Sequence, residues 1–308
     1  MRRRLFVLAV AAMMAFMPLV AQHAHCNEQQ CCNKTTEQLT GDDAVAWAKQ
    51  HVGRLIDNYL ATAGNKLDPD ELRKQLAPIG YDGTNVPEYR AAEKWLVDTV
   101  YRRMMQRAIM EGNSSITVLT GPGGAGKSTA TKNIDFSGEG VLYDSALNSY
   151  ESLKKVVDKA INAGMNDIKV IAFYNDIETC YKNSIKRGKA TNRFLGIAYL
   201  TNAYRNNQGK IKNLRNHYPQ VKVQAVDNNH NNGGIWVTPE QAEQWDFTID
   251  NETLNHMLVY VLNEIYQQQI TGSQIKSAAG DVLDVKGADE LGRQLMQEIA
   301  RHLPNASK

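Results

Sequence analysis

Residues 116–130 read ITVLTGPGGAGKSTA: an apolar run, a glycine-rich loop and a helix-compatible segment in direct succession. Within them, Gly121, Gly126, Lys127 and Ser128 match the phosphate-loop pattern G-x-x-x-x-G-K-[ST] without a mismatch. The alternative is a glycine-rich turn that fits the pattern by chance. The apolar run predicts a buried strand and the residues after the loop are compatible with a helix, which is the context that the pattern requires. We therefore interpret the stretch as a nucleotide-binding loop.

Phosphate binding explains the residue types in this loop. Its four glycines allow backbone conformations that a side chain would forbid, so that N–H groups converge on phosphate oxygens. The helix after the loop would add the positive end of its dipole. Lys127 would reach the β- and γ-phosphates, and the Ser128 hydroxyl would bind Mg²⁺. The expected nucleotide-binding residues are Gly121, Pro122, Gly123, Gly124, Ala125, Gly126, Lys127, Ser128 and Thr129.

ATP and Mg²⁺ are the expected cofactors. A fourth strand is predicted at 221–226, and no guanine-specific NKxD-like motif follows it, which favours ATP over GTP. The charge balance of 35 Lys and Arg against 33 Asp and Glu does not indicate nucleic-acid binding. A chain of 308 residues, 43% of them hydrophobic, can bury one sizeable core and an accessory part.

The N-terminus predicts export. Three arginines at 2–4 precede an apolar run at 5–21, as in a secretory signal peptide ending near residue 24. The alternative is a short uncleaved membrane anchor, since 17 residues are close to the lower limit for crossing a bilayer. Both interpretations place the body outside the cytoplasm, secreted or periplasmic in the first case and membrane-anchored in the second.

Residues 25–41 are polar and predict a linker. Cys26, Cys31 and Cys32 cluster there beside His23 and His25. A disulfide or a cysteine-bearing tail is the simpler interpretation, and a metal site is the alternative.

The remainder predicts an α/β fold: a three-layer P-loop NTPase or kinase-like parallel sheet, with an N-terminal helical accessory layer and C-terminal helices. Apolar residues at helical spacing fill 42–112, and these helices are a candidate surface for a protein partner. The sheet domain occupies 113–250, and residues 251–308 form the C-terminal helical region. The predicted strands are 116–120, 140–143, 168–174 and 221–226. The predicted helices are 42–63, a short one after Asp68, 87–110, 127–133, 150–163, 177–187, 193–216, 254–269 and 288–303.

Asp144 is a candidate catalytic residue. It ends the second predicted strand, and the carboxyl ends of parallel strands form the ligand edge of a sheet. An acid next to a phosphate loop can hold Mg²⁺ through a water or accept a proton from a substrate hydroxyl. The alternative is a carboxylate that caps the following turn. Asp176 most simply caps the helix that begins at Ile177.

Residues 181–193, YKNSIKRGKATNR, concentrate positive charge after the third predicted strand. Arginines that close over a γ-phosphate stabilise the charge of its transfer, and Arg187 and Arg193 are the candidates. The alternative is a solvated basic helix end that complements the helix dipole.

Three stretches together resemble the zeta-toxin branch of P-loop kinases: GPGGAGKSTA, VLYDSALNSYESLKKVVDKAINAG and IKVIAFYNDIETCYKNSIKRG. The resemblance covers about 115–229. It implies a kinase that uses ATP and Mg²⁺ to phosphorylate a hydroxyl of a small molecule, which in the best-known members is UDP-N-acetylglucosamine. By position it assigns Lys127 and Ser128 to the nucleotide and Mg²⁺, Asp144 to the acidic turn, and Arg187 and Arg193 to the lid.

The chain departs from this family at one point. Zeta toxins usually carry an additional strand with an aspartate base between the phosphate-loop helix and the acidic turn, and 133–140 leaves little room for it. Asp144 then combines two roles, Asp135 substitutes for the base, or the acceptor differs. A nucleotide-gated interaction protein, in which ATP orders the helices of 42–111 or 192–217 for a partner, is the main alternative function. An ATPase without transfer to a small molecule is the third.

Overall fold

The structure, a computed structural model, describes residues 38–229 and 234–304. The signal or anchor predicted for 1–24, most of the predicted linker, and Cys26, Cys31 and Cys32 lie outside the described residues. No helix in the described part of the chain is both long and apolar enough to cross a membrane.

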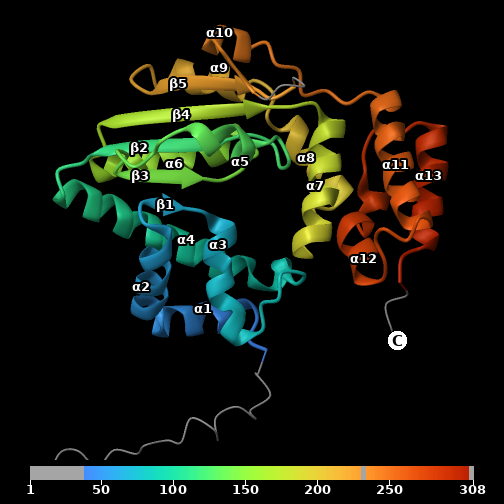
Figure 1. Ribbon diagram of the computed structural model, residues 1–308, viewed down its shortest axis with the longest axis horizontal. Helices are drawn as coiled ribbons and strands as arrows, with labels where there is room; N and C mark the ends of the chain where they lie inside the picture. The colour runs from blue at the N-terminus through green and yellow to red at the C-terminus, as the bar shows by residue number, and fades with distance from the viewer. Residues whose placement is uncertain (1–37, 230–233, 305–308) are drawn as a thin grey trace, which may run out of the picture. The chain divides into compact units, whose positions relative to one another are not determined.

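Six strands of the described residues form one sheet in the order β1-β3-β2-β4-β5-β6, so the predicted α/β class is confirmed. All neighbours pair in parallel except β6, which is antiparallel to β5. Figure 1 shows the arrowheads of β3, β4 and β5 pointing to the same side, towards α7 and α8. The strands are β1 (Lys66–Leu67), β2 (Ser115–Thr120), β3 (Val141–Asp144), β4 (Asp167–Tyr174), β5 (Lys222–Asp227) and β6 (Ile235–Val237).

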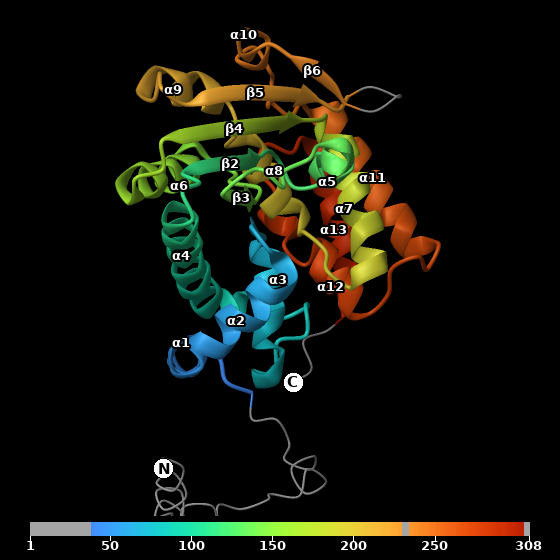
Figure 2. The ribbon, with the colours of Figure 1, turned by 60° about the vertical axis from the view of Figure 1, so that its left-hand side comes forward.

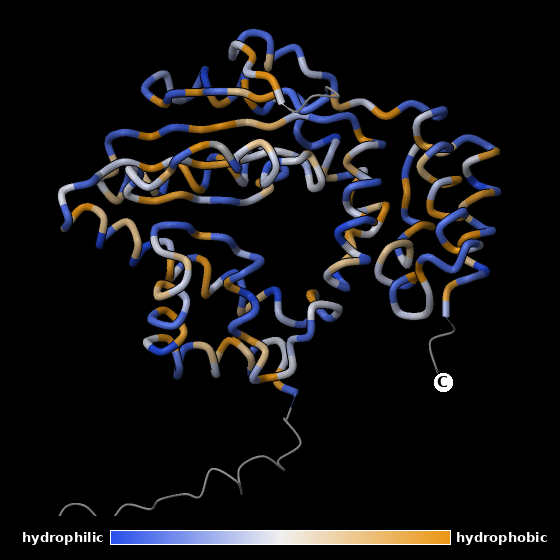
Figure 3. Tube along the Cα trace, in the orientation of Figure 1, coloured by the Kyte–Doolittle hydropathy of each residue, from blue (hydrophilic) through white to orange (hydrophobic). Residues whose placement is uncertain are grey.

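The central strands are buried on both faces, as continuous apolar runs in a parallel sheet predict. Successive side chains point to opposite faces, so Val118 belongs to one hydrophobic cluster and Leu119 to another. The same division separates Val170 from Ile171 on β4. Figure 3 shows these strands as largely apolar segments within a more polar helical surround. Burial on both faces therefore holds β2, the strand before the glycine-rich loop, at the centre of the molecule.

Helices cover both faces of the sheet. The cluster that includes Val118 is completed mainly by α1 (Gly41–Gln50), α2 (Val52–Ala63), α3 (Pro69–Arg73), η1 (Lys74–Ile79), α4 (Val86–Met110), α6 (Tyr150–Ala163) and α9 (Lys210–His217). The cluster that includes Leu119 is completed by α7 (Ile177–Thr191), α8 (Ile197–Arg205), α10 (Pro239–Ala242), α11 (Asn251–Tyr266), α12 (Ser273–Ala279), η3 (Val282–Asp284) and α13 (Glu290–Arg301).

Several predicted boundaries were wrong. The helix predicted over 42–63 is broken at His51 into α1 and α2, and the one over 193–216 is broken into α8 and α9 before Gly209, which has a positive φ of 68°. The helix predicted over 127–133 is one short α-helix, α5 (Lys127–Ala130), followed by a 3₁₀ turn, η2 (Thr131–Asn133). The strands β1 and β6, the helices α10 and α12 and the 3₁₀ turn η3 were not predicted.

The N-terminal helical segment supplies a strand to the sheet. β1 lies within it and pairs in parallel with β3 at the edge of the sheet, with Leu67 opposite Tyr143. The next two residues in this register are Asp68, directly after β1, and Asp144, the last residue of β3, so they lie side by side. The first residue after β1 consequently reaches the same edge as the glycine-rich loop.

Candidate functional site

The candidate site lies at the carboxyl ends of β1, β2 and β3. β2 leads directly into the glycine-rich loop, and the register places Leu119 of β2 opposite Asp144 of β3. Ligands of open α/β sheets bind outside this edge. Figure 2 shows the loop and α5 near α7, beyond the ends of these strands.

Two glycines of the loop lie where no side chain fits. Gly121 has a φ of +151°, and a Cβ added there would lie 2.5 Å from the carbonyl oxygen of Phe173. Gly124 has a φ of +81°, and its Cβ would lie 2.1 Å from the carbonyl oxygen of Cys180. The chain can therefore pass this close to β4 and α7 only as bare main chain.

Side-chain amides hold the loop from two directions. Asn183 of α7 donates to the carbonyl oxygen of Gly124 at 2.9 Å, and Asn228, directly after β5, donates to that of Ala125 at 2.6 Å. Within the loop the Ala125 N–H donates to the Pro122 carbonyl oxygen at 3.2 Å. These hydrogen bonds occupy carbonyl oxygens of the loop, and other backbone N–H groups of the loop remain available to a ligand.

The free donors of the loop are backbone N–H groups. Those of Gly123, Gly124, Gly126 and Lys127 donate to no acceptor in residues 38–229 and 234–304. Ser128 and Thr129 follow, exposed in the first turn of α5. This row of donors is the arrangement that an anion such as phosphate requires.

Lys127 folds back over the loop. Its Nζ donates to the carbonyl oxygen of Gly121 at 3.3 Å. Burial lowers the pKa of Lys127, while the carboxylates of Asp144 and Asp70 oppose that shift. Arg187 lowers the pKa of Lys127 further. The Lys127 ammonium group is thus bound to the loop backbone, and the nearby acids favour its charged form.

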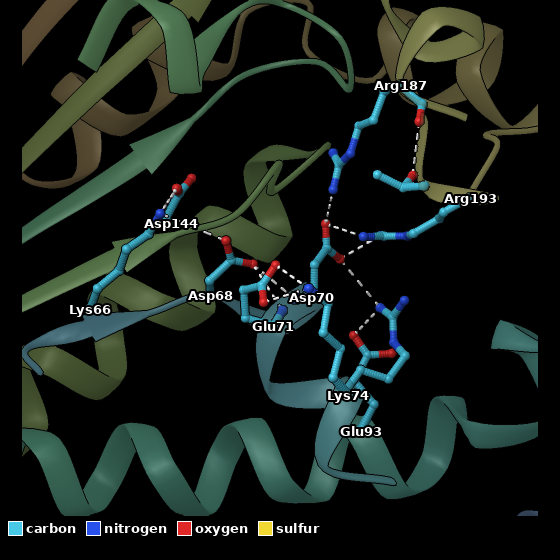
Figure 4. A network of polar contacts seen from close by, with 11 residues as sticks. Lys66, Asp68, Asp70, Glu71, Lys74, Glu93, Asp144, Arg187 and Arg193 are labelled. Atoms are coloured by element: carbon cyan, nitrogen blue, oxygen red, sulfur yellow. Dashed lines mark hydrogen bonds and ion pairs between the residues drawn. The ribbon is translucent and has the colours of Figure 1, made fainter. Parts of the chain in front are cut away.

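Asp144 is nearly buried and ion-paired. Its Oδ2 lies 2.7 Å from Nζ of Lys66, the first residue of β1, and its side chain is 9% exposed. The same Nζ lies 3.7 Å from Asp68 Oδ2. Burial lowers the pKa of Lys66, but its two carboxylate partners outweigh burial and raise it. Lys66 thus stays charged between two acids at the end of neighbouring strands (Figure 4).

Asp68 also caps α3. Its Oδ1 accepts from the N–H groups of Asp70 at 2.9 Å and Glu71 at 3.4 Å. Burial raises the pKa of Asp68, and the neighbouring charges of Asp70 and Asp144 raise it further. A carboxylate with a raised pKa is a stronger base and therefore a better proton acceptor.

Arg187 and Arg193 come together on one carboxylate. Both pair with Asp70 of α3, Arg187 at 3.1 Å and Arg193 in closer contact (Figure 4). Burial raises the pKa of Asp70, but Arg193 and then Arg187 outweigh this and lower it to about 2. The two candidate lid residues are thus brought together, and their partner is an acid of the N-terminal segment.

A cavity of about 270 Å³ opens between α3–η1 and α7. Its charged and polar lining includes the arginine pair and the carboxylate of Asp70 with which the two arginines pair. The lining residues are Asp70, Glu71, Lys74, Ala77, Tyr81, Asp82, Gly83, Arg187, Thr191 and Arg193.

Two further aspartates, one expected as a substitute base and one as a helix cap, lie elsewhere. Asp135 is exposed and accepts from the Ser137 N–H in its own turn. Asp176 caps α7 as predicted, accepting from the Thr179 N–H at 2.8 Å. Neither takes part in the site.

Sequence reasoning missed one cation below the loop. Lys210 is buried, and its Nζ donates to Thr120 Oγ1 at 2.9 Å, to the Leu147 carbonyl oxygen at 3.1 Å and to Asn207. Burial lowers its pKa strongly. Its contacts fix the end of β2 to the turn after Asp144. Its only sequence signal, a lysine at a helix start, is too common to indicate this position.

The donor set fits Mg²⁺ bound together with phosphate. No group of three or more His, Cys, Asp or Glu in the described residues is arranged to cage a metal. Mg²⁺ in nucleotide sites needs none, since it keeps several waters and takes one or two protein oxygens beside phosphate oxygens. The exposed Ser128 hydroxyl and Asp144 could supply such oxygens.

Neither a scan against protein-family models nor a search of curated proteins finds a match for this chain.

Proposed function

We propose that the protein is a P-loop phosphotransferase that moves the γ-phosphate of ATP, with Mg²⁺, to a hydroxyl of a small molecule. One observation carries the proposal. A glycine-rich loop with free N–H groups and Lys127 follows β2 at the sheet edge where β1 and β3 lead into two acids, Asp68 and Asp144, and two arginines pair with Asp70 of the adjoining helix. Phosphoryl transfer needs little besides positioning, charge neutralisation and a proton acceptor, and each has a residue here.

Each residue has a role in this proposal. The loop N–H groups and Lys127 hold the β- and γ-phosphates, and Arg187 neutralises charge on the transferred group. Mg²⁺, when bound through Ser128 and by way of water through Asp144, neutralises phosphate oxygens. Asp68 accepts the hydroxyl proton, because its pKa is raised and Lys66 and the α3 N–H groups orient it. Asp144 is held by Lys66, which favours a positioning role over that of base.

We further propose that the sheet is that of a zeta-toxin-like kinase with one strand supplied from elsewhere in the chain. The resemblance implies an additional strand bearing an aspartate base, for which 133–140 has no room. β1 lies beside β3 and is followed directly by Asp68, although it precedes the loop in the sequence. The support comes from the strand order: β1 lies beside β3 and leads into an aspartate, as the additional strand of the family would. Neither Asp135 nor a double role for Asp144 is then required.

Transfer of label from γ-labelled ATP to a metabolite extract tests the proposal. With the full-length chain and Mg²⁺ we expect a labelled product. Lys127→Ala should abolish it, whereas Lys132→Ala, an exposed lysine one turn further on, should keep it. Asp68→Asn should slow transfer by about 100-fold or more without loss of ATP binding.

Two results would count against the proposal. If Lys127→Ala formed as much labelled product as the wild type, the loop would have no part in the reaction. Tight ATP binding without any labelled product would favour a nucleotide-gated interaction protein instead.

A further inference from the structure

Asp70 occupies an anion site made by arginines. Its carboxylate pairs with Arg187 and Arg193, and Arg73 Nη2 lies 3.6 Å away, so three guanidinium groups surround one negative charge. Arg73 also pairs with Glu93, but in the described part of the chain Arg187 and Arg193 have Asp70 as their only carboxylate partner. The site can therefore accommodate a further negative charge.

Arg73 supplies a second indication of surplus donors. It is 5% exposed, and its Nε and Nη1 atoms have no hydrogen-bond partner in the described residues. Although Nη2 pairs with Glu93, unpaired N–H groups in a buried guanidinium are costly, and an additional anion nearby would offset part of that cost. Arginine is also the residue best suited to bind carboxylate or phosphate, through its planar fork.

The cavity beside this cluster limits the size of what binds. Its volume of about 270 Å³ lies just below the range of about 300–1,000 Å³ typical of pockets for drug-sized ligands. A nucleotide-activated sugar belongs to that larger class. Arg187 lines the cavity and lies one turn along α7 from Asn183, whose side chain donates to the Gly124 carbonyl oxygen, so the cavity adjoins the helix that holds the phosphate loop.

We propose that this cavity binds the acceptor, and that the acceptor is a small hydroxyl compound carrying a carboxylate or phosphate group, which pairs with Arg193 in competition with Asp70. The inference rests on the proposed function for the identity of the reaction. The hydroxyl oxygen forms a bond to the γ-phosphorus of ATP, the bond from that phosphorus to the bridging oxygen breaks, ADP leaves, and Asp68 takes the hydroxyl proton.

Calorimetric titration of the full chain tests the anion site separately from the reaction. Lys127→Ala serves as the background, because it disables the phosphate loop as a competing anion site. The probes are glycerate as the carboxylate, glycerol 3-phosphate as the phosphate, and glycerol as the neutral control. We expect at least one of the two anions to bind and glycerol not to bind; the tighter anion identifies the preferred group.

Substitutions then locate the binding. Adding Arg193→Gln should weaken the anion by about tenfold, the value of one charge-assisted hydrogen bond. Adding Arg215→Gln, an arginine paired with Glu240 and Glu243 elsewhere, should change nothing. Asp70→Asn should strengthen binding, because it removes the internal competitor; a purely structural Asp70 would give weaker binding.

The proposal is overturned if neither anion binds, or if Arg193→Gln leaves the anion affinity unchanged. Because the background variant lacks a working phosphate loop, neither result would argue against phosphate transfer by the wild-type protein. Conversely, a failure of wild-type protein to bind ATP would leave a positive anion result standing.

Discussion

Gly124 is the residue whose conformation the loop depends on most. Its φ of +81° disfavours any other residue, and an added Cβ would meet the Cys180 carbonyl oxygen, which is backbone and cannot turn aside. Gly124→Ala should therefore move the loop away from α7 and weaken ATP binding by about tenfold or more. Gly138→Ala is the matched control, since no atom lies within 4 Å of its added Cβ. Equal ATP affinities in the two variants, measured by calorimetry, would contradict this account of the loop.

Asp70 makes stability depend on pH. Its pKa is lowered from 3.8 to about 2 because the arginines outweigh its burial, so its ionised form stabilises the folded state. This contribution is complete above the unfolded-state pKa and is lost as the pH falls towards the folded-state value. A shift of nearly two units corresponds to about 2 kcal/mol.

Urea unfolding at about pH 5 and about pH 2 measures this contribution. Wild-type protein should lose about 2 kcal/mol more stability between these pH values than Asp70→Asn does. Asp57→Asn, at an exposed aspartate of α2, should behave as the wild type. The account of the arginine pair is wrong if the loss in Asp70→Asn equals that in the wild type.

At the residue scale, the sequence predicted the groups that lie in one motif. The residues 121–129 stand consecutively, so one pattern identifies them. Lys66, Asp68 and Asp70 precede the loop by more than fifty residues, and only strand pairing brings them to it. The sequence predicted a short helix after Asp68, and Asp68 caps that helix, but a helix start carries no information about a neighbouring strand.

At the element scale, β1 is the strand on which the site depends. It is two residues long, and Leu67 is completely buried in the cluster beneath the sheet. Leu67→Ala should cost about 2–5 kcal/mol of unfolding free energy, because it removes buried methyl groups and leaves a cavity. Leu283→Ala, at a leucine that is 60% exposed, should cost less than about 0.5 kcal/mol.

Denaturant unfolding of both variants gives the comparison. Similar costs for the two leucines would show that β1 is not anchored in the core as described.

Elements with a strong pattern were predictable and those without one were not. The strands β2 and β4 are rich in apolar and β-branched residues and were found within a residue or two of their ends. β1 has too few residues to show any periodicity, and it forms because an open edge of β3 is available. The break at Gly209 lies within a segment whose apolar spacing is helical on both sides, so periodicity alone joined α8 to α9.

For the whole molecule, the order of the sheet explains why three distant segments share one site. Placing β3 between β1 and β2 brings the chain after residue 67, the loop at 121–128 and the acid at 144 to one edge. α7 and the residues after it then close the opposite side with Arg187 and Arg193, which pair with Asp70. The N-terminal helical segment is thus part of the candidate site.

Binding of a non-hydrolysable ATP analogue tests the central claim most directly. In calorimetry with millimolar Mg²⁺, the full-length protein and Lys132→Ala should bind the analogue, and Lys127→Ala should bind it at least about 100-fold more weakly. Failure of folded wild-type protein to bind any nucleoside triphosphate would contradict the account of the loop and of every residue assigned around it.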